Sequence, residues 1–113
     1  MADEAFLAEV GAIGNADLVK LSGIIDRSAQ AGMESAYAEA QSGGPVVLDF
    51  TDVTFISSTG IALIVGLLAK ARAAGRAVRA YGLTPHYQEI FRITRLADFI
   101  DLFDSQETAV AAS

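Results

Sequence analysis

The chain has 113 residues, of which 52% are hydrophobic and 19% are charged. A chain of this length and composition buries roughly two-thirds of its unfolded surface and does not resemble a disordered segment. We therefore expect a single domain over residues 1–113. The 14 acidic and 8 basic residues give a formal net charge of -6. This charge repels phosphate backbones and anionic lipid headgroups, which argues against nucleic acid and membrane surfaces as partners.

Metal and thiol chemistry have little support in the sequence. It contains no cysteine and a single histidine, His86, so disulfides, thiolate nucleophiles and zinc-ligand sets are excluded. Asp49 and Asp52 flank a predicted strand end, where ordinary solvation of a turn explains a carboxylate pair more often than Mg²⁺ does. We expect no cofactor and no metal, and we expect His86 to face solvent on a helix.

The location of the protein is predicted from two absences in the sequence. Acidic residues stand at positions 3 and 4, where a secretory signal needs positive charge and a following apolar region. The longest weakly polar run, 55–69, is interrupted by hydroxyl residues and is shorter than the ~20 apolar residues of a spanning helix. We expect a cytoplasmic protein that does not insert into a membrane.

The first half of the chain predicts a hairpin followed by a helix. Residues 5–10 and 17–21 are short mixed runs separated by turn-forming glycine and asparagine, which predicts two strands. Residues 28–41 are rich in alanine and glutamate and precede the glycines and proline of 42–45, which predicts a helix with a strong stop.

A strand and the clearest helix follow. Residues 46–50 form a β-branched run without helical period, which is typical of a central strand buried on both faces, and Thr51 and Asp52 are predicted to end it. Residues 61–74 then form a second helix, which Gly75 terminates.

The last third of the chain repeats this alternation. Residues 76–83 predict a strand, and Thr84 followed by Pro85 predicts the start of a helix that runs to about Ile93.

The end of the chain predicts one more strand and a short helix. Residues 99–103 form the strand, and Asp104 with Glu107 three residues later is a capping-box pattern that opens a helix through Ala109. Strands that alternate with helices in this way predict an α/β fold with a largely parallel sheet, made mixed by the opening hairpin.

Three adjacent hydroxyl residues, Ser57, Ser58 and Thr59, stand where a strand passes into the second helix. The first turn of a helix favours an anion, and a phosphate on one hydroxyl adds about -1.5 to -2 charges to the surrounding surface. Alternatively, Ser58 or Thr59 is simply the helix N-cap, the commonest role of such residues at a helix start. The two roles are compatible.

The run from Val46 to Ile61 resembles the signature of STAS domains, the fold of anti-sigma factor antagonists. In that family a buried strand and an Asp-containing turn lead through an aromatic–aliphatic pair to Asp-Ser-Ser/Thr-Gly. The acceptor serine of the family carries over onto Ser58, whereas the preceding Asp is Ser57 here. That departure leaves Ser57 and Thr59 as further candidates, and Ser58 is our choice.

Two further segments carry the resemblance, which covers about 18–109. Residues 21–26 resemble a strand-Gly-x-aliphatic-Asp turn whose Asp lies near the acceptor serine, and residues 96–99 resemble the C-terminal region of the family. The implied fold is a mixed, mostly parallel sheet of four to five strands, with about four helices packed mainly on one face. Asp26 therefore lies near Ser58 or, alternatively, caps the first helix.

The second helix offers a candidate docking surface. One stripe is predicted to face the core, and it consists of Ile61, Ile64, Val65 and Leu68. Leu63 and Leu67 lie on a neighbouring flank, where they form either a partly exposed docking patch or part of a broadly buried helix. The partner-binding residues we predict are Asp26, Ser57, Ser58, Thr59, Gly60, Leu63 and Leu67.

No catalytic motif is present, because the sequence lacks the phosphate-binding loop, the nucleophile elbow and the dinucleotide fingerprint. We therefore expect a non-enzyme. The resemblance implies an anti-sigma factor antagonist that binds an anti-sigma factor/serine kinase of the HATPase type and is released when Ser58 is phosphorylated. A PP2C-type phosphatase then restores it. The alternatives are a constitutive accessory subunit of a lipid-transport ABC system, or a sensor that holds a small ligand near Gly60.

Overall fold

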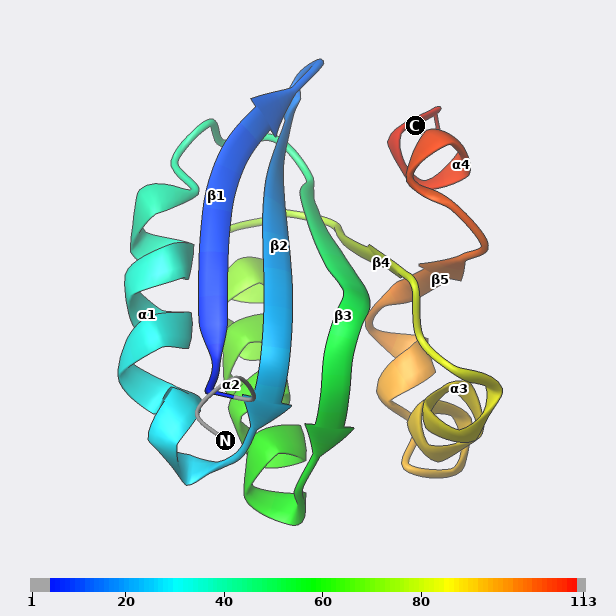
Figure 1. Ribbon diagram of the computed structural model, residues 1–113. Coiled ribbons are helices and arrows are strands. Elements are labelled where there is room, and N and C mark those ends of the chain that lie inside the picture. Colours follow the sequence, from blue (N-terminus) through cyan, green and yellow to red (C-terminus); the bar gives the residue numbers. More distant parts are fainter. Residues whose placement is uncertain (1–4, 112–113) are drawn as a thin grey trace.

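The computed structural model describes residues 5–111, and it is an α/β domain built on one five-stranded sheet (Figure 1). The ends of the predicted domain, residues 1–4 and 112–113, lie outside the described residues. The strands are β1 (Leu7–Ile13), β2 (Ala16–Ile25), β3 (Val46–Ile56), β4 (Val78–Tyr81) and β5 (Asp101–Phe103). The helices are α1 (Gln30–Glu39), α2 (Ser58–Ala73), α3 (Pro85–Ile93) and α4 (Gln106–Ala111), with short 3-10 turns at Arg27–Ala29 and Leu96–Asp98.

The sheet has the order β1-β2-β3-β4-β5 and is mixed. β1 and β2 are antiparallel and are joined by a two-residue turn in which Gly14 has a φ of +61°. The pairs β2–β3, β3–β4 and β4–β5 are all parallel. The predicted hairpin and the predicted mostly parallel sheet are therefore confirmed.

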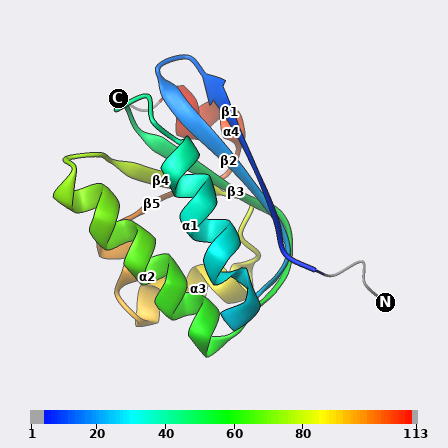
Figure 2. The same ribbon diagram turned by 90° about the vertical axis from the view of Figure 1, so that its left-hand side faces the viewer.

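The two faces of the sheet are covered unequally. Figure 2 shows α1 and α2 side by side across one face, and the main hydrophobic core lies beneath them. A smaller cluster on the other face packs α4 through Ala109 against Val47 and Tyr81. Val47 faces that cluster while Val46 and Leu48 face the main core, so the first half of β3 is buried on both sides, as its run of β-branched residues predicts.

β3 continues beyond the predicted end at Thr51 and Asp52. Its second half pairs with β2, where Ser22 lies opposite Asp52 and Ile25 opposite Ile56, with irregularities in the register on the way. Of the residues in β3, only Val46–Asp49 pair with β4. Thr51 and Asp52 are therefore exposed strand residues past the end of β4, and their polarity is what concealed the strand.

The helix starts match the predictions at α3 and differ at the last helix. Thr84 caps α3, where its Oγ1 accepts from the amide of Tyr87 at 3.3 Å, as predicted. The last helix starts with a reciprocal pair between Ser105 and Thr108, in which each amide donates to the other's hydroxyl. The predicted capping pair of Asp104 and Glu107 is therefore wrong by one position. A hydroxyl one residue closer to the helix takes the cap.

A buried ion pair holds the amino ends of the parallel strands. The Asp17 carboxylate accepts from Arg76 Nη2 at 2.6 Å and from the amide and hydroxyl of Ser42 at 3.0 and 2.7 Å. The Arg76 guanidinium also donates to the carbonyls of Gly44 at 2.7 Å and Ala40 at 2.5 Å. Burial raises the pKa of Asp17, but the hydrogen bonds from Ser42 and Arg76 together hold that pKa below 3.8.

Candidate functional site

The candidate site lies at the carboxyl ends of β2 and β3, where β3 passes into α2. Ser57 is the N-cap of α2, because its Oγ accepts from the amide of Gly60 at 3.0 Å. The Ser57 amide donates to the carbonyl of Ile25 at 3.0 Å, which ties this corner to the end of β2. The capping role that the sequence assigned to Ser58 or Thr59 thus belongs to Ser57.

Ser58 and Thr59 begin α2 and are exposed. Within residues 5–111, the hydroxyl of neither residue makes a hydrogen bond, whereas Ser57 is half-buried and occupied by the cap. Their backbone amides lie in the first turn, where the helix itself provides no acceptor. The corner therefore presents a free hydroxyl at the positive end of the α2 dipole.

Gly60 fixes the position of this corner. A Cβ at Gly60 would lie 2.0 Å from the carbonyl oxygen of Ile25, so the first turn of α2 packs directly on the β2 backbone. The end of β3 is held from the other side, because the Ile56 amide donates to the Tyr87 hydroxyl of α3 at 2.9 Å. Ser58 is thus carried by a rigid junction of two strands and two helices.

Asp26 follows Ile25 and caps the 3-10 turn that precedes α1. Its Oδ1 accepts from the Ser28 hydroxyl at 2.6 Å and from the Ser28 amide at 2.9 Å. These hydrogen bonds lower the pKa of Asp26, so the carboxylate stays charged. Of the two predicted roles, the structure shows the cap. The pairing of Ile25 with Ile56 nevertheless places Asp26 at the same edge of the sheet as Ser57 and Ser58.

The predicted faces of α2 need a correction. Leu67 is only 7% exposed and Leu63 is half-buried, whereas Val65, predicted to face the core, is 45% exposed. α1 packs beside α2 (Figure 2). The flank of α2 that faces α1 carries Leu63 and Leu67, whereas Val65 lies on another side of the helix. A single helix pattern does not reveal on which side a neighbouring helix will pack. Of the two alternatives for this flank, the structure shows burial for Leu67 and partial exposure for Leu63.

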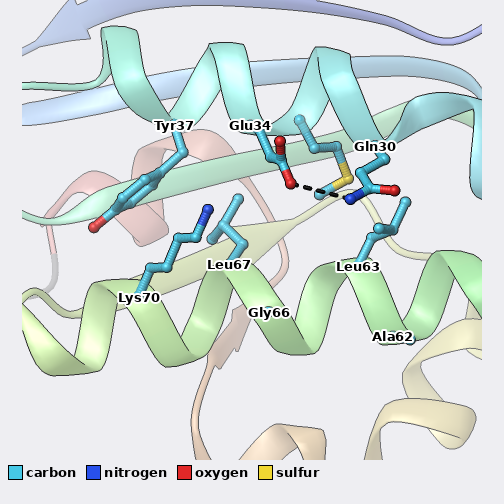
Figure 3. A pocket seen from close by; sticks show the side chains of 9 residues that line it. Gln30, Glu34, Tyr37, Ala62, Leu63, Gly66, Leu67 and Lys70 are labelled. Carbon is cyan, nitrogen blue, oxygen red and sulfur yellow. Dashed lines mark hydrogen bonds between the residues drawn. The ribbon is translucent and has the colours of Figure 1, made fainter.

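A groove separates α1 from α2, and Figure 3 shows its lining. Its volume is about 200 Å³, and its lining residues are Gln30, Met33, Glu34, Tyr37, Ala62, Leu63, Gly66, Leu67 and Lys70. In Figure 3 the side chains of Leu63, Leu67 and Lys70 extend from α2 toward α1. Because Ala62 lies one helical turn beyond Ser58, the groove begins about one turn from the exposed hydroxyl.

Residues 5–111 contain neither a metal-ligand cluster nor a membrane-spanning helix. In that part no group of three or more histidine, cysteine, aspartate or glutamate side chains is arranged to hold a metal, and no helix has both the length and the apolarity to span a bilayer.

The Asp49 carboxylate is buried and accepts a hydrogen bond from the amide of Thr51 at 2.8 Å. Burial, followed by the nearby Asp49 carboxylate, raises the pKa of Tyr81. His86 is exposed, as predicted.

The junction between β3 and α2, with its three hydroxyl residues, lies in a region that matches a known protein family. A family model described as "Mlab, STAS domain" matches residues 8–103, which is most of the chain. The chain belongs to the STAS domain family. The predicted resemblance to that family is therefore confirmed.

Solved structures share the STAS fold. An anti-sigma factor antagonist from Mycobacterium paratuberculosis is 20% identical, with a TM-score of 0.74 over 96% of this chain and 94% of that chain. The anti-sigma factor antagonist SpoIIAA in its unphosphorylated form is 17% identical, with a TM-score of 0.67 over 94% of each chain. Bacillus SpoIIAA in its phosphorylated form is 18% identical, with a TM-score of 0.64 over 94% of this chain and 96% of that chain. Comparison with curated proteins gave no match.

The sequence did not predict the groove. Leu63 and Leu67 were placed on a docking surface, but Met33, Tyr37 and Lys70 were not connected with them. One signal was present, because Gly66 interrupts an otherwise strong helical run and nothing in the sequence requires a glycine there.

Proposed function

We propose that this STAS domain is a non-catalytic, phosphorylatable switch of the anti-sigma factor antagonist type. In its unmodified form it binds, in the cytoplasm, an anti-sigma factor that is also a serine kinase of the HATPase type. Phosphorylation of Ser58 releases it, and a PP2C-type phosphatase restores it. The observation that carries this proposal is the exposed Ser58 hydroxyl, which makes no hydrogen bond within residues 5–111 at the first position of α2.

The chemistry of the corner supports a large effect of a phosphate there. The amides of the first turn and the helix dipole stabilise a phosphate on Ser58, so the modified state is accommodated without unfolding. At the same time the phosphate adds negative charge to a surface where Asp26 is already ionised, on a chain with a net charge of -6. A partner surface matched to the neutral hydroxyl is then repelled and sterically blocked.

The geometry favours Ser58 over Ser57 as the acceptor. Ser57 Oγ accepts the Gly60 amide and lies 3.4 Å from the Ile25 carbonyl, so its modification would break the cap of α2. Ser58 has no such role. Thr59 shares the exposure of Ser58 and lies one residue further into the helix, so the experiment below includes it.

The solved relatives support the proposal in one respect. SpoIIAA has been solved in forms titled unphosphorylated and phosphorylated, and both have this fold. A domain of this shape therefore tolerates a phosphate. The alternative role in a lipid-transport ABC system is not favoured, because the similar solved proteins are described as anti-sigma factor antagonists or, for phosphorylated SpoIIAA, as a cell fate determinant.

The test is phosphorylation of purified protein by the serine kinase of its host with ATP, followed by mapping of the site by mass spectrometry. We expect one phosphate, on Ser58, that is lost in Ser58→Ala and kept in the matched variant Thr59→Ala. Phosphorylation should also release the kinase in a pull-down, and the phosphatase should reverse both effects. A kinase that is active on another substrate but leaves all three hydroxyls unmodified would count against the switch. Stable co-purification with a transport ATPase would favour the alternative.

A further inference from the structure

Gly66 is a glycine that the fold of this domain does not explain. It lies in the interior of the 16-residue helix α2, where glycine is less stable than alanine. A Cβ at Gly66 would meet no atom within 4 Å. The other two glycines in α1 and α2 have neighbours, since a Cβ at Gly60 would meet the Ile25 carbonyl and one at Gly32 would meet the Phe6 ring. The space over Gly66 is therefore open to something outside the chain.

That space belongs to the groove between α1 and α2. The groove has a volume of about 200 Å³, and Met33, Leu63 and Leu67 contribute apolar surface to it. A cavity of about 150 Å³ lined by apolar side chains holds a benzene molecule. The groove therefore has room for one large apolar side chain, such as leucine, methionine or phenylalanine, directly over Gly66 (Figure 3).

The rim carries one carboxylate, Glu34 of α1, and one ammonium, Lys70 of α2, and they differ in their partners. Glu34 accepts a hydrogen bond at 3.2 Å from Gln30 on the same helix. Lys70 lies four residues after Gly66 and has no ion pair among residues 5–111, although its side chain reaches toward α1. Four residues of helix correspond to about 6 Å along the axis, or about one turn. A carboxylate placed one turn from the inserted side chain would therefore meet Lys70.

We propose that the groove between α1 and α2 is a docking site for a helix of the protein partner. A single large apolar side chain of that helix inserts over Gly66, and a carboxylate one turn away pairs with Lys70. This proposal rests on the proposed function, because the groove begins one turn from Ser58 and the same partner then covers both. A phosphate on Ser58 would then add charge about one turn from the groove, under the same partner.

The probe is a helical peptide of about 16 residues, rich in alanine and glutamine, with one leucine anchor and a glutamate four residues to either side of it. Titration of ¹⁵N-labelled protein should shift the amides of Leu63, Gly66 and Lys70. Replacing the anchor by alanine should weaken binding at least about tenfold, the size expected for losing one buried leucine side chain. Shifts that are absent at millimolar peptide, or that lie away from α1 and α2, would overturn the proposal.

Two variants of the protein sharpen the test. Gly66→Leu fills the groove with the chain's own side chain and should weaken peptide binding at least about tenfold. Ala73→Leu adds the same side chain to an exposed position of α2 outside the groove and should leave binding unchanged. Circular dichroism checks that both variants fold. Equal affinity of the two variants would contradict docking over Gly66.

The docking proposal and the proposed switch can be rejected independently of each other. Phosphorylation of Ser58 without peptide binding would remove the docking proposal and leave the proposed function intact. Peptide binding in the groove without phosphorylation of Ser58 would keep the docking site and remove the switch.

Discussion

The two ends of the parallel strands both carry polar residues, but they use them differently. At the amino ends, Asp17 and Arg76 have side chains only 8% and 7% exposed, and their hydrogen bonds are made to Ser42, Gly44 and Ala40 or to each other. At the carboxyl ends, the Ser58 hydroxyl is exposed and makes no hydrogen bond within residues 5–111. The first end uses its polar groups to hold the fold, and the second leaves one exposed, where the proposed switch requires it. Mutations at the two ends should therefore separate stability from signalling.

Loss of the ion pair should give the largest effect. Asp17→Ala leaves the buried Arg76 guanidinium without its carboxylate and should reduce the free energy of unfolding by about 3–5 kcal/mol. Urea denaturation measures this loss. The double variant with Arg76→Met should lose less than the two single variants together, because no unpaired charge remains. A single-variant loss below about 1 kcal/mol would mean that the pair is not a structural anchor.

Gly60→Ala should give the next largest effect. The added methyl meets the Ile25 carbonyl oxygen, so the first turn of α2 must move away from β2, at a cost of about 1–3 kcal/mol. The matched control is Gly66→Ala in the same helix, where the methyl meets no atom within 4 Å and should stabilise by about 0.5–1 kcal/mol. Thermal unfolding of the two variants should shift in opposite directions. Shifts of the same sign would contradict the close contact at Gly60.

Alanine variants of Ser57 and Ser58 should have smaller effects on stability, and these effects should differ between the two serines. Ser57→Ala removes the cap of α2 and should cost about 1 kcal/mol. Ser58→Ala removes an exposed hydroxyl without a hydrogen bond and should change stability by less than about 0.5 kcal/mol. Urea midpoints measure stability, and the phosphorylation assay measures function. A stability loss at Ser58 as large as at Ser57 would show that Ser58 has a structural role.

Acid should lower the stability of the domain through Asp17 at the amino ends of the strands. The pKa of Asp17 is lower in the folded chain than the 3.8 of an unfolded one, so its contribution to stability is complete above that value. It is lost as the pH falls through the lower folded pKa. We expect the urea midpoint to fall between pH ~5 and pH ~2, and to fall less steeply in Asp17→Asn. Asp26→Asn is the comparison variant for the carboxyl ends of the strands. The pKa of Asp26 is also lowered, but its carboxylate is not part of the ion pair. An unchanged slope in Asp17→Asn would contradict the ion pair's role.

The order of the elements was predictable because local signals decide it. The β-branched run at 46–50 and the Thr84–Pro85 start of α3 each correspond to a feature of the structure. The extension of β3 through Thr51 and Asp52 was not predictable. It depends on where β4 ends, and that property of the sheet leaves no mark on the polar residues themselves.

The site was predictable in its position but not in its contacts. The motif placed three hydroxyls at the start of α2, and the structure separates them into the capping Ser57 and the exposed Ser58 and Thr59. The burial of Leu67 depends on the side from which α1 packs, which no pattern within α2 encodes. Long-range packing therefore decides the details that local sequence leaves open.

The contact between Gly60 and the Ile25 carbonyl also bears on the enzyme that would modify Ser58. It presents the acceptor in a single helical conformation, so an approaching kinase need not order a loose segment first. Such a kinase must recognise the start of a folded helix and not an extended strand. A short synthetic peptide covering residues 53–63 lacks β2, on which the first turn of α2 packs. We therefore expect it to be a poorer kinase substrate than the intact domain.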